Sequence, residues 1–168
     1  MYHAKFTMNL PLSTPMQDFT LPQPLTGEYP QNPSQRETPV RAGKRILVMD
    51  DEASILELMG RMLGSQRYDV ETAANGADAV AQYRAAMEAG RRFDVVILDL
   101  TMAEGMNGLD TFKAMQAVDP AVKAILSSGY SHEPVVLNYK KYGIAGVAPK
   151  PYRVKDLLAA VAGVLTGQ

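Results

Sequence analysis

The chain has 168 residues, of which 46% are apolar, and its formal net charge is −1 at pH 7. This composition is typical of a globular domain with a packed core, and the small net charge gives no reason to expect a nucleic acid or a membrane surface as partner. Cysteine is absent, which excludes disulfide bonds, a thiol nucleophile and cysteine-based zinc sites. The sequence shows neither a signal-peptide pattern nor an apolar run of about 18 residues, so we expect a cytoplasmic protein without membrane contact.

Residues 1–42 differ in composition from the rest of the chain. They hold seven of the 11 prolines, separated by many Gln, Ser, Thr and Asn residues. Prolines at this density interrupt helices and remove hydrogen-bond donors from sheets. We therefore expect a disordered extension or linker over 1–42 and one folded domain over 43–168.

From residue 45 onward, apolar strand-like runs alternate with helix-like segments. In chain order, the pattern predicts a strand over 46–49, a helix over 53–63, a strand over 70–73, a helix over 76–89, a strand over 95–98, a helix over 109–118, a strand over 122–126, a helix over 134–142, a strand over 144–147 and a helix over 154–165. Strict alternation of this kind predicts βαβ units and a parallel sheet. The strands lack polar alternation, as expected when helices cover both faces of the sheet.

Polar side chains stand at the carboxyl ends of four predicted strands. Asp50 and Asp51 follow the first strand, Asp99 the third, Ser127 ends the fourth, and Lys150 follows the fifth. Sites in open parallel sheets form at the carboxyl ends of the strands, near the point where the strand order reverses. We therefore expect three carboxylates, a hydroxyl and an ammonium to share one polar cleft.

Three close carboxylates need a cation, and an all-oxygen cluster with few protein ligands suits Mg²⁺. The ion would also neutralise a phosphoryl group while one carboxylate attacks phosphorus to form an acyl phosphate. Lys150 would pair with one phosphoryl oxygen and Ser127 would donate to another. Taken singly, each residue also has an ordinary explanation as a turn residue, a helix cap or a solvated side chain. Their coincidence at successive strand ends favours the phosphoryl site.

These motifs resemble, in spacing and order, the receiver domain of two-component response regulators over residues 43–168. MDDE resembles the acidic pair of that family, VVILDLTM the strand that carries the phosphorylated aspartate, ILSSG the strand that ends in the hydroxyl, and PKPY the Lys-Pro-aromatic signature. The closer likeness is to receivers attached to hybrid sensor histidine kinases, on the segments SSGYSHEPVVLNYKKYGIAGV and KPYRVKDLLAAV.

The resemblance implies a flavodoxin-like (βα)5 fold, a doubly wound five-stranded parallel sheet with strand order 2-1-3-4-5. It implies phosphorylation of Asp99, with Mg²⁺ held by Asp51, Asp99 and the Thr101 carbonyl and with Asp50 acting largely through water. The donor would be a histidine kinase or a histidine phosphotransfer protein in a bacterial cytoplasm. A homodimer through the fourth helix, fifth strand and fifth helix would also fit the family. The chain would not be an enzyme beyond self-catalysed phosphorylation and dephosphorylation of Asp99.

Three positions near the site depart from the family pattern or need comment. Val147 occupies the switch position, where many regulators carry a Phe or Tyr whose rotamer couples to the hydroxyl. The usual coupling is therefore in doubt here. Tyr130 or Tyr152 could substitute for the missing aromatic residue, but we expect each of them to be packed or solvated. Ala103 stands where proline is usual. Pro151, next to Lys150, can adopt a cis peptide bond that directs the lysine.

Two other functions compete with a phosphorylated receiver. A degenerate receiver would act only as a binding module, although all five key side chains are present. A Mg²⁺-dependent phosphatase of the haloacid-dehalogenase type uses similar groups, but its nucleophile precedes its acidic pair along the chain. Here the pair Asp50 and Asp51 precedes Asp99, which argues against that class.

Overall fold

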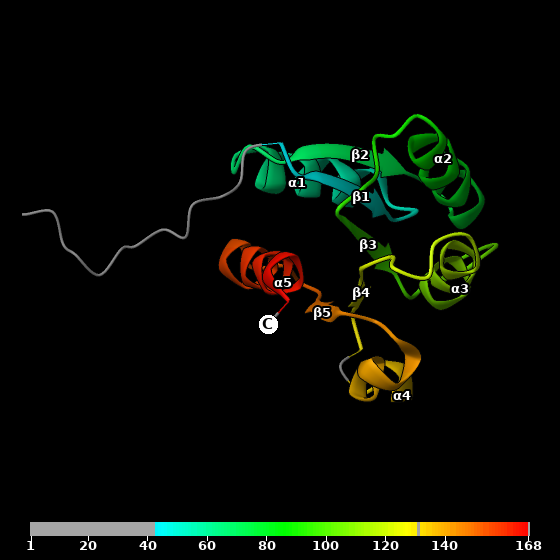
Figure 1. Ribbon diagram of the computed structural model, residues 1–168. Coiled ribbons are helices and arrows are strands. Elements are labelled where there is room, and N and C mark those ends of the chain that lie inside the picture. Colours follow the sequence, from blue (N-terminus) through cyan, green and yellow to red (C-terminus); the bar gives the residue numbers. More distant parts are fainter. Residues whose placement is uncertain (1–42, 131, 168) are drawn as a thin grey trace, which may run out of the picture. The chain divides into compact units, whose positions relative to one another are not determined.

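The computed structural model describes residues 43–130 and 132–167; the predicted extension over 1–42 lies outside these residues. Five strands alternate with helices along the chain (Figure 1). The elements are β1 Arg45–Met49, α1 Ala53–Gly64, β2 Asp69–Ala73, α2 Gly76–Glu88, β3 Val95–Asp99, α3 Gly108–Val118, β4 Ala124–Ser128, α4 Pro134–Leu137, the 3₁₀ helix η1 Tyr139–Tyr142, β5 Gly146–Pro149 and α5 Val154–Thr166.

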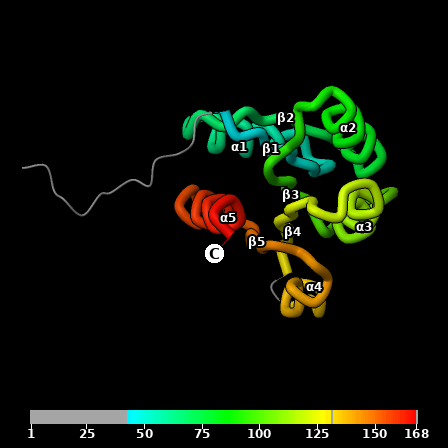
Figure 2. Tube along the Cα trace, in the orientation of Figure 1, coloured from blue at the N-terminus to red at the C-terminus, as the bar shows by residue number. Residues whose placement is uncertain are grey.

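The five strands form one parallel sheet in the order β2-β1-β3-β4-β5. Helices α1 and α5 cover one face, and α2, α3 and α4 cover the other (Figures 1 and 2). The predicted flavodoxin-like fold and strand order are therefore confirmed. In this topology the order reverses between β1 and β3, so their carboxyl ends border the expected cleft.

Strand β1 shows why a strand covered on both faces carries a continuous apolar run, here Ile46–Met49, whereas the edge strand β2 has the mixed sequence DVETA. Ile46 and Val48 pack with α1 and α5 on one face, whereas Leu47 and Met49 pack with α2 and α3 on the other. All four side chains are buried. Because successive side chains point to opposite faces of a sheet, a strand covered on both sides needs apolar residues throughout.

The last two strands begin two residues later than predicted. Val122 and Ile144 are buried but precede β4 and β5. The Ile144 N–H donates back to the Tyr139 carbonyl, at the start of the 3₁₀ turn, at 3.2 Å instead of joining the sheet. Buried apolar residues that flank a strand have the same sequence pattern as the strand itself, so the prediction placed these boundaries too early.

The fourth helix is shorter than predicted. A single helix over 134–142 was expected, but α4 ends at Leu137 and a separate 3₁₀ turn follows. Asn138 lies between them with φ −119° and ψ 24°, and its side-chain amide donates to the Pro134 carbonyl at 3.0 Å. The Asn138 N–H donates to the same carbonyl at 3.1 Å, so the last hydrogen bond of α4 is intact and the helix ends because the backbone angles of Asn138 leave the helical region.

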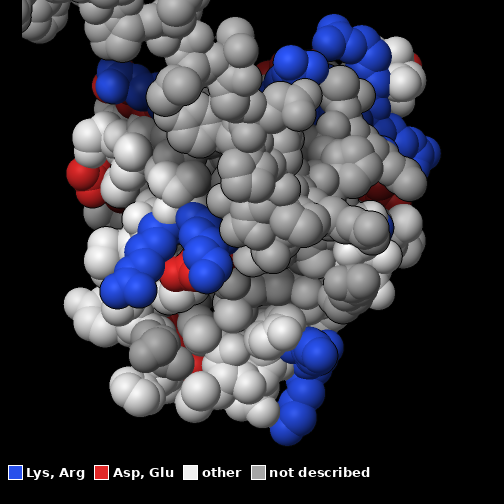
Figure 3. All heavy atoms as spheres, turned by 90° about the vertical axis from the view of Figure 1, so that its left-hand side faces the viewer, with Lys and Arg blue, Asp and Glu red and all other residues white. Residues whose placement is uncertain are grey.

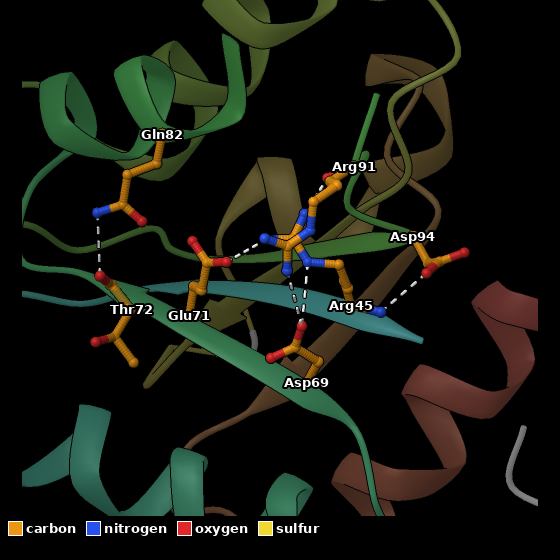
Figure 4. A network of polar contacts seen from close by, with 7 residues as sticks. All are labelled: Arg45, Asp69, Glu71, Thr72, Gln82, Arg91 and Asp94. Atoms are coloured by element: carbon orange, nitrogen blue, oxygen red, sulfur yellow. Dashed lines mark hydrogen bonds and ion pairs between the residues drawn. The ribbon is translucent and has the colours of Figure 1, made fainter. Parts of the chain in front are cut away.

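Arg45 ties together the amino ends of the strands (Figure 4). Its guanidinium pairs with Glu71 and, at 3.2 Å, with Asp69 from the neighbouring strand β2. It also lies 4.4 Å from the ring centroid of Phe93, and the Arg45 N–H donates to the Asp94 carboxylate at 2.9 Å. These contacts join β1, β2 and the segment that enters β3, at the edge of the sheet away from the carboxyl ends.

Figure 3 shows the charged side chains on one face of the described residues. Lys and Arg side chains stand there in separate groups, several of them beside acidic side chains. Within residues 43–130 and 132–167, no helix has the length and apolar character needed to cross a bilayer.

Candidate functional site

Three aspartates meet at the carboxyl ends of β1 and β3. Asp50 and Asp99 are each 2% exposed, whereas Asp51 is open to solvent. One carboxylate oxygen from each lies within 4.8 Å of the other two. An all-oxygen donor set of this kind, open on one side, fits a hydrated Mg²⁺ ion.

Backbone N–H groups hold two of these carboxylates in place. The Glu52 N–H donates to Asp50 Oδ1 at 2.9 Å, within the turn that leads into α1. The Ala103 N–H donates to Asp51 Oδ2 at 3.0 Å, across 52 positions of sequence. The second contact needs a residue with an N–H at position 103, which a proline lacks.

Lys150 lies between the two buried carboxylates. Its ammonium is 2.7 Å from Asp50 Oδ2 and 3.1 Å from Asp99 Oδ1. The Lys150 N–H donates to the Ser128 carbonyl at 2.8 Å, which extends the pairing of β5 with β4, and the Lys150–Pro151 peptide bond is cis. Burial alone would lower the pKa of Lys150, but its bonds to Asp50 and Asp99 outweigh that effect and raise the pKa above its ordinary value.

The carboxyl group of Asp99 is held in an environment that disfavours its charge. Burial raises the pKa of Asp99, and the Lys150 ammonium and the Thr101 backbone N–H offset only part of that rise. Asp99 Oδ1 is fully buried, and the Lys150 ammonium, 3.1 Å away, lies beside it without meeting hydrogen-bond geometry. One ammonium does not balance the three neighbouring carboxylates, so a further cation would stabilise the cluster. The residues present therefore fit a divalent metal. The Thr101 carbonyl as a ligand stays a prediction.

Ser127 faces Asp99 from the next strand. The two residues are paired in register between β3 and β4, and Ser127 is 1% exposed. Its hydroxyl is hydrogen-bonded to the Tyr152 hydroxyl, from the loop between β5 and α5. Burial raises the pKa of Tyr152 above its ordinary value, so the phenol is protonated at neutral pH.

Tyr152 is packed, as expected, but it also makes a contact that the sequence analysis did not predict. Its ring does pack against the core under α1 and α5, but its hydroxyl reaches the site. Tyr130 is 66% exposed, in agreement with the expectation of a solvated side chain. Val147 pairs with Leu126 in the sheet and packs on the core under α2 and α3. The position of Tyr152 directly after Lys150-Pro151 was the available signal for its role.

Sequence reasoning also missed Gly108, the first residue of α3. A Cβ at this position would lie 2.5 Å from the Asp99 carbonyl oxygen and 2.9 Å from the carbonyl carbon. The helix thus begins directly against the backbone of Asp99, where only glycine fits. The Asn107 side chain caps the same helix by accepting from the Asp110 N–H at 3.0 Å.

The family model for the response regulator receiver domain matches residues 46–162. The chain belongs to the receiver domain family. It is 31% identical over 120 residues to the chemotaxis protein CheY of Thermotoga maritima, a match that covers 71% of this chain and 95% of that protein. The crystal structure of the response regulator TrrA of Thermotoga maritima in complex with Mg²⁺ and BeF superposes with a TM-score of 0.63 at 30% identity, covering 73% of this chain and 99% of that one.

A third match lies within a much longer protein. The sensor kinase CckA of Brucella abortus is 28% identical over 134 residues, which are 80% of this chain and 14% of the kinase. The likeness to receivers attached to hybrid kinases stays a prediction, whereas membership of the receiver family is established.

Proposed function

We propose that this receiver domain accepts a phosphoryl group on Asp99 from a phosphohistidine of a histidine kinase or a histidine phosphotransfer protein. The observation that carries the proposal is the position of Lys150, 2.7 Å from Asp50 and 3.1 Å from Asp99, at the edge where Asp51 and Ser127 also lie. An ammonium that lies beside two buried carboxylates can pair with the oxygens of a phosphoryl group attached to either carboxylate.

The side chains of the site have distinct roles in the transfer. An Asp99 oxygen forms the new P–O bond as the P–N bond to the donor histidine breaks and its electron pair returns to the imidazole nitrogen. Lys150 pairs with a phosphoryl oxygen and Ser127 donates to another. Asp50 and Asp51, with Asp99, would hold Mg²⁺. When bound, this ion supplies positive charge that offsets the carboxylates and the phosphoryl group.

The acyl phosphate would then shift the domain between two conformations, and the surface formed by α4, β5 and α5 would present the change to a partner or to a second copy. Exposed apolar side chains support this proposal: Leu137 is 65% exposed and Val154 is 50% exposed. The proposed setting is the cytoplasm of a bacterium, in keeping with the bacterial origin of the relatives named above.

We further propose that the chain has no turnover beyond the phosphorylation and dephosphorylation of its own Asp99. The complete set of acidic, hydroxyl and ammonium groups disfavours a degenerate binding module. The position of the acidic pair before Asp99 along the chain disfavours a phosphatase of the haloacid-dehalogenase type.

Intact-protein mass spectrometry after incubation with Mg²⁺ and acetyl phosphate or phosphoramidate tests the proposal. We expect a labile gain of one phosphoryl group in the wild type and none in Asp99→Asn. No gain in a folded wild type would favour the binding module, and persistent labelling of Asp99→Asn would mean that another residue is the acceptor. Sustained hydrolysis of p-nitrophenyl phosphate would favour the phosphatase.

A further inference from the structure

The Ser127 hydroxyl and the Tyr152 hydroxyl form a hydrogen bond that the transfer chemistry by itself does not require. Ser127 lies in β4 opposite Asp99, whereas Tyr152 belongs to the loop that leads into α5. Val147, in the neighbouring strand, has a side chain that cannot form a hydrogen bond with Ser127. A change in the orientation of the Ser127 hydroxyl would therefore change the hydrogen bond that the Tyr152 phenol makes.

We propose that Tyr152 is the positioning residue for Ser127, orienting its hydroxyl toward the phosphoryl group and linking phosphorylation of Asp99 to the start of α5. This inference rests on the proposed function and names how that site would be regulated. The link would run through one hydrogen bond and the packed ring of Tyr152.

The number of protons available supports this assignment. A serine hydroxyl has one proton to donate and two positions to accept. Among residues 43–130 and 132–167, the Ser127 hydroxyl has no other side-chain or backbone hydrogen-bond partner than Tyr152. If Tyr152 donates its proton to Ser127, the serine keeps its own proton for a phosphoryl oxygen. If the serine donated instead, its only proton would be used up.

The surroundings of the pair favour the arrangement in which Tyr152 is the donor once Asp99 is phosphorylated. Ser127 is buried, so water is a poor competitor for its hydroxyl. A phosphoryl oxygen is anionic and accepts a stronger hydrogen bond than a neutral phenol does. The serine proton therefore turns toward the phosphoryl group, and the bond with Tyr152 reverses direction or persists with the phenol as donor.

The ring of Tyr152 transmits the change because it is packed. It contacts the core that α5 shares with the sheet, and α5 begins only two residues later, at Val154. A shift of Ser127 toward the phosphoryl group would draw the phenol with it and bias the position of the first turn of α5. That turn carries the exposed side chain of Val154, which lies on the proposed partner surface.

The test compares Tyr152→Phe with the matched substitution Tyr83→Phe. Both remove one hydroxyl from a packed tyrosine; that of Tyr83 donates to the Asp119 carboxylate at 2.9 Å, before the amino end of β4. The rate of labelling by acetyl phosphate with Mg²⁺ is followed by intact-protein mass spectrometry. We expect Tyr152→Phe to be labelled about three- to tenfold more slowly than the wild type, the range of one hydrogen bond, and Tyr83→Phe to be labelled at the wild-type rate.

A double-mutant cycle with Ser127→Ala shows whether Tyr152 acts through the serine. We expect Tyr152→Phe to have no further effect on the labelling rate once the serine hydroxyl is gone. Amide NMR shifts on addition of Mg²⁺ and beryllofluoride supply a second readout: shifts at 152–156 should shrink in Tyr152→Phe, while those next to Asp99 persist.

The outcomes separate the inference from the proposed function. A wild type that gains no phosphoryl group would overturn both. A labelled wild type with an equal rate for Tyr152→Phe would overturn only the inference. Equal slowing in Tyr83→Phe, or an undiminished effect in the Ser127→Ala background, would do the same, because the phenol would then act through general stability or by another route.

Discussion

The backbone N–H of Ala103 donates a hydrogen bond of 3.0 Å to the carboxylate of Asp51. This bond joins the loop after Asp99 to the acidic turn after β1, and it orients the one exposed carboxylate of the cluster. The candidate metal ligands are therefore positioned by a backbone N–H group as well as by the strands that they follow.

Ala103→Pro should weaken Mg²⁺ binding by about two- to tenfold, the range of one hydrogen bond. Proline has no N–H, so the Asp51 carboxylate would lose its orienting donor. Isothermal titration calorimetry with MgCl₂ measures the change in Kd. Ala103→Ser keeps the N–H and serves as the control. Equal Kd values for the proline and serine variants would contradict this role of Ala103.

Lys150→Met should have opposite effects on metal binding and on phosphorylation. Removing the ammonium takes a positive charge away from the cluster, so Mg²⁺ should bind more tightly, whereas labelling by acetyl phosphate should slow at least tenfold because the phosphoryl group loses its partner. In EDTA, the free energy of unfolding should fall by about 1–3 kcal/mol, since Asp50 and Asp99 stay buried without their cation. Calorimetry, mass spectrometry and urea unfolding measure the three quantities. Parallel losses of metal binding and labelling would instead indicate a collapsed site.

Gly108→Ala should destabilise the domain by about 2 kcal/mol or more and slow the labelling of Asp99. The added Cβ would lie 2.5 Å from the Asp99 carbonyl oxygen, so the helix or the acceptor strand must move. Gly163→Ala is the matched control, because its Cβ would meet no atom of residues 43–130 and 132–167 within 4 Å and it lies inside α5. There, alanine should raise the free energy of unfolding by up to about 1 kcal/mol. Urea unfolding compares the two, and similar changes in both variants would argue against the close contact.

The pKa of Asp99 predicts how the stability of the metal-free domain depends on pH. Burial raises the pKa of this carboxyl group above its unfolded value of about 3.9. Its contribution to stability is therefore fully present below the unfolded pKa and is lost as pH rises through the folded pKa. In EDTA, the wild type should lose stability relative to Asp99→Asn as the pH rises from about 4 toward neutrality.

Urea unfolding of both proteins across this range measures the difference, and Mg²⁺ at neutral pH should restore stability to the wild type alone. A difference between the two proteins that does not change with pH would contradict the raised pKa of Asp99.

Much of the fold could be predicted because each strand carries its own local signal. Strands covered on both faces must be apolar throughout, so 46–49 and 95–98 stood out without knowledge of their partners. The predicted boundaries were wrong where the local pattern does not follow the hydrogen bonds of the backbone. Ile144 is buried without belonging to β5, and the backbone angles of Asn138 divide the fourth helix.

The sequence by itself determined which chemical groups reach the site, because Asp50, Asp99 and Lys150 directly end or follow strands whose carboxyl ends must meet in a parallel sheet. The contacts that position those groups were decided only by the tertiary structure. The N–H of Ala103 reaches Asp51, and the phenol of Tyr152 reaches Ser127, through loops whose paths depend on packing against distant elements. A periodic pattern reports which face of an element is buried, but it does not report where a loop places one hydroxyl or one N–H.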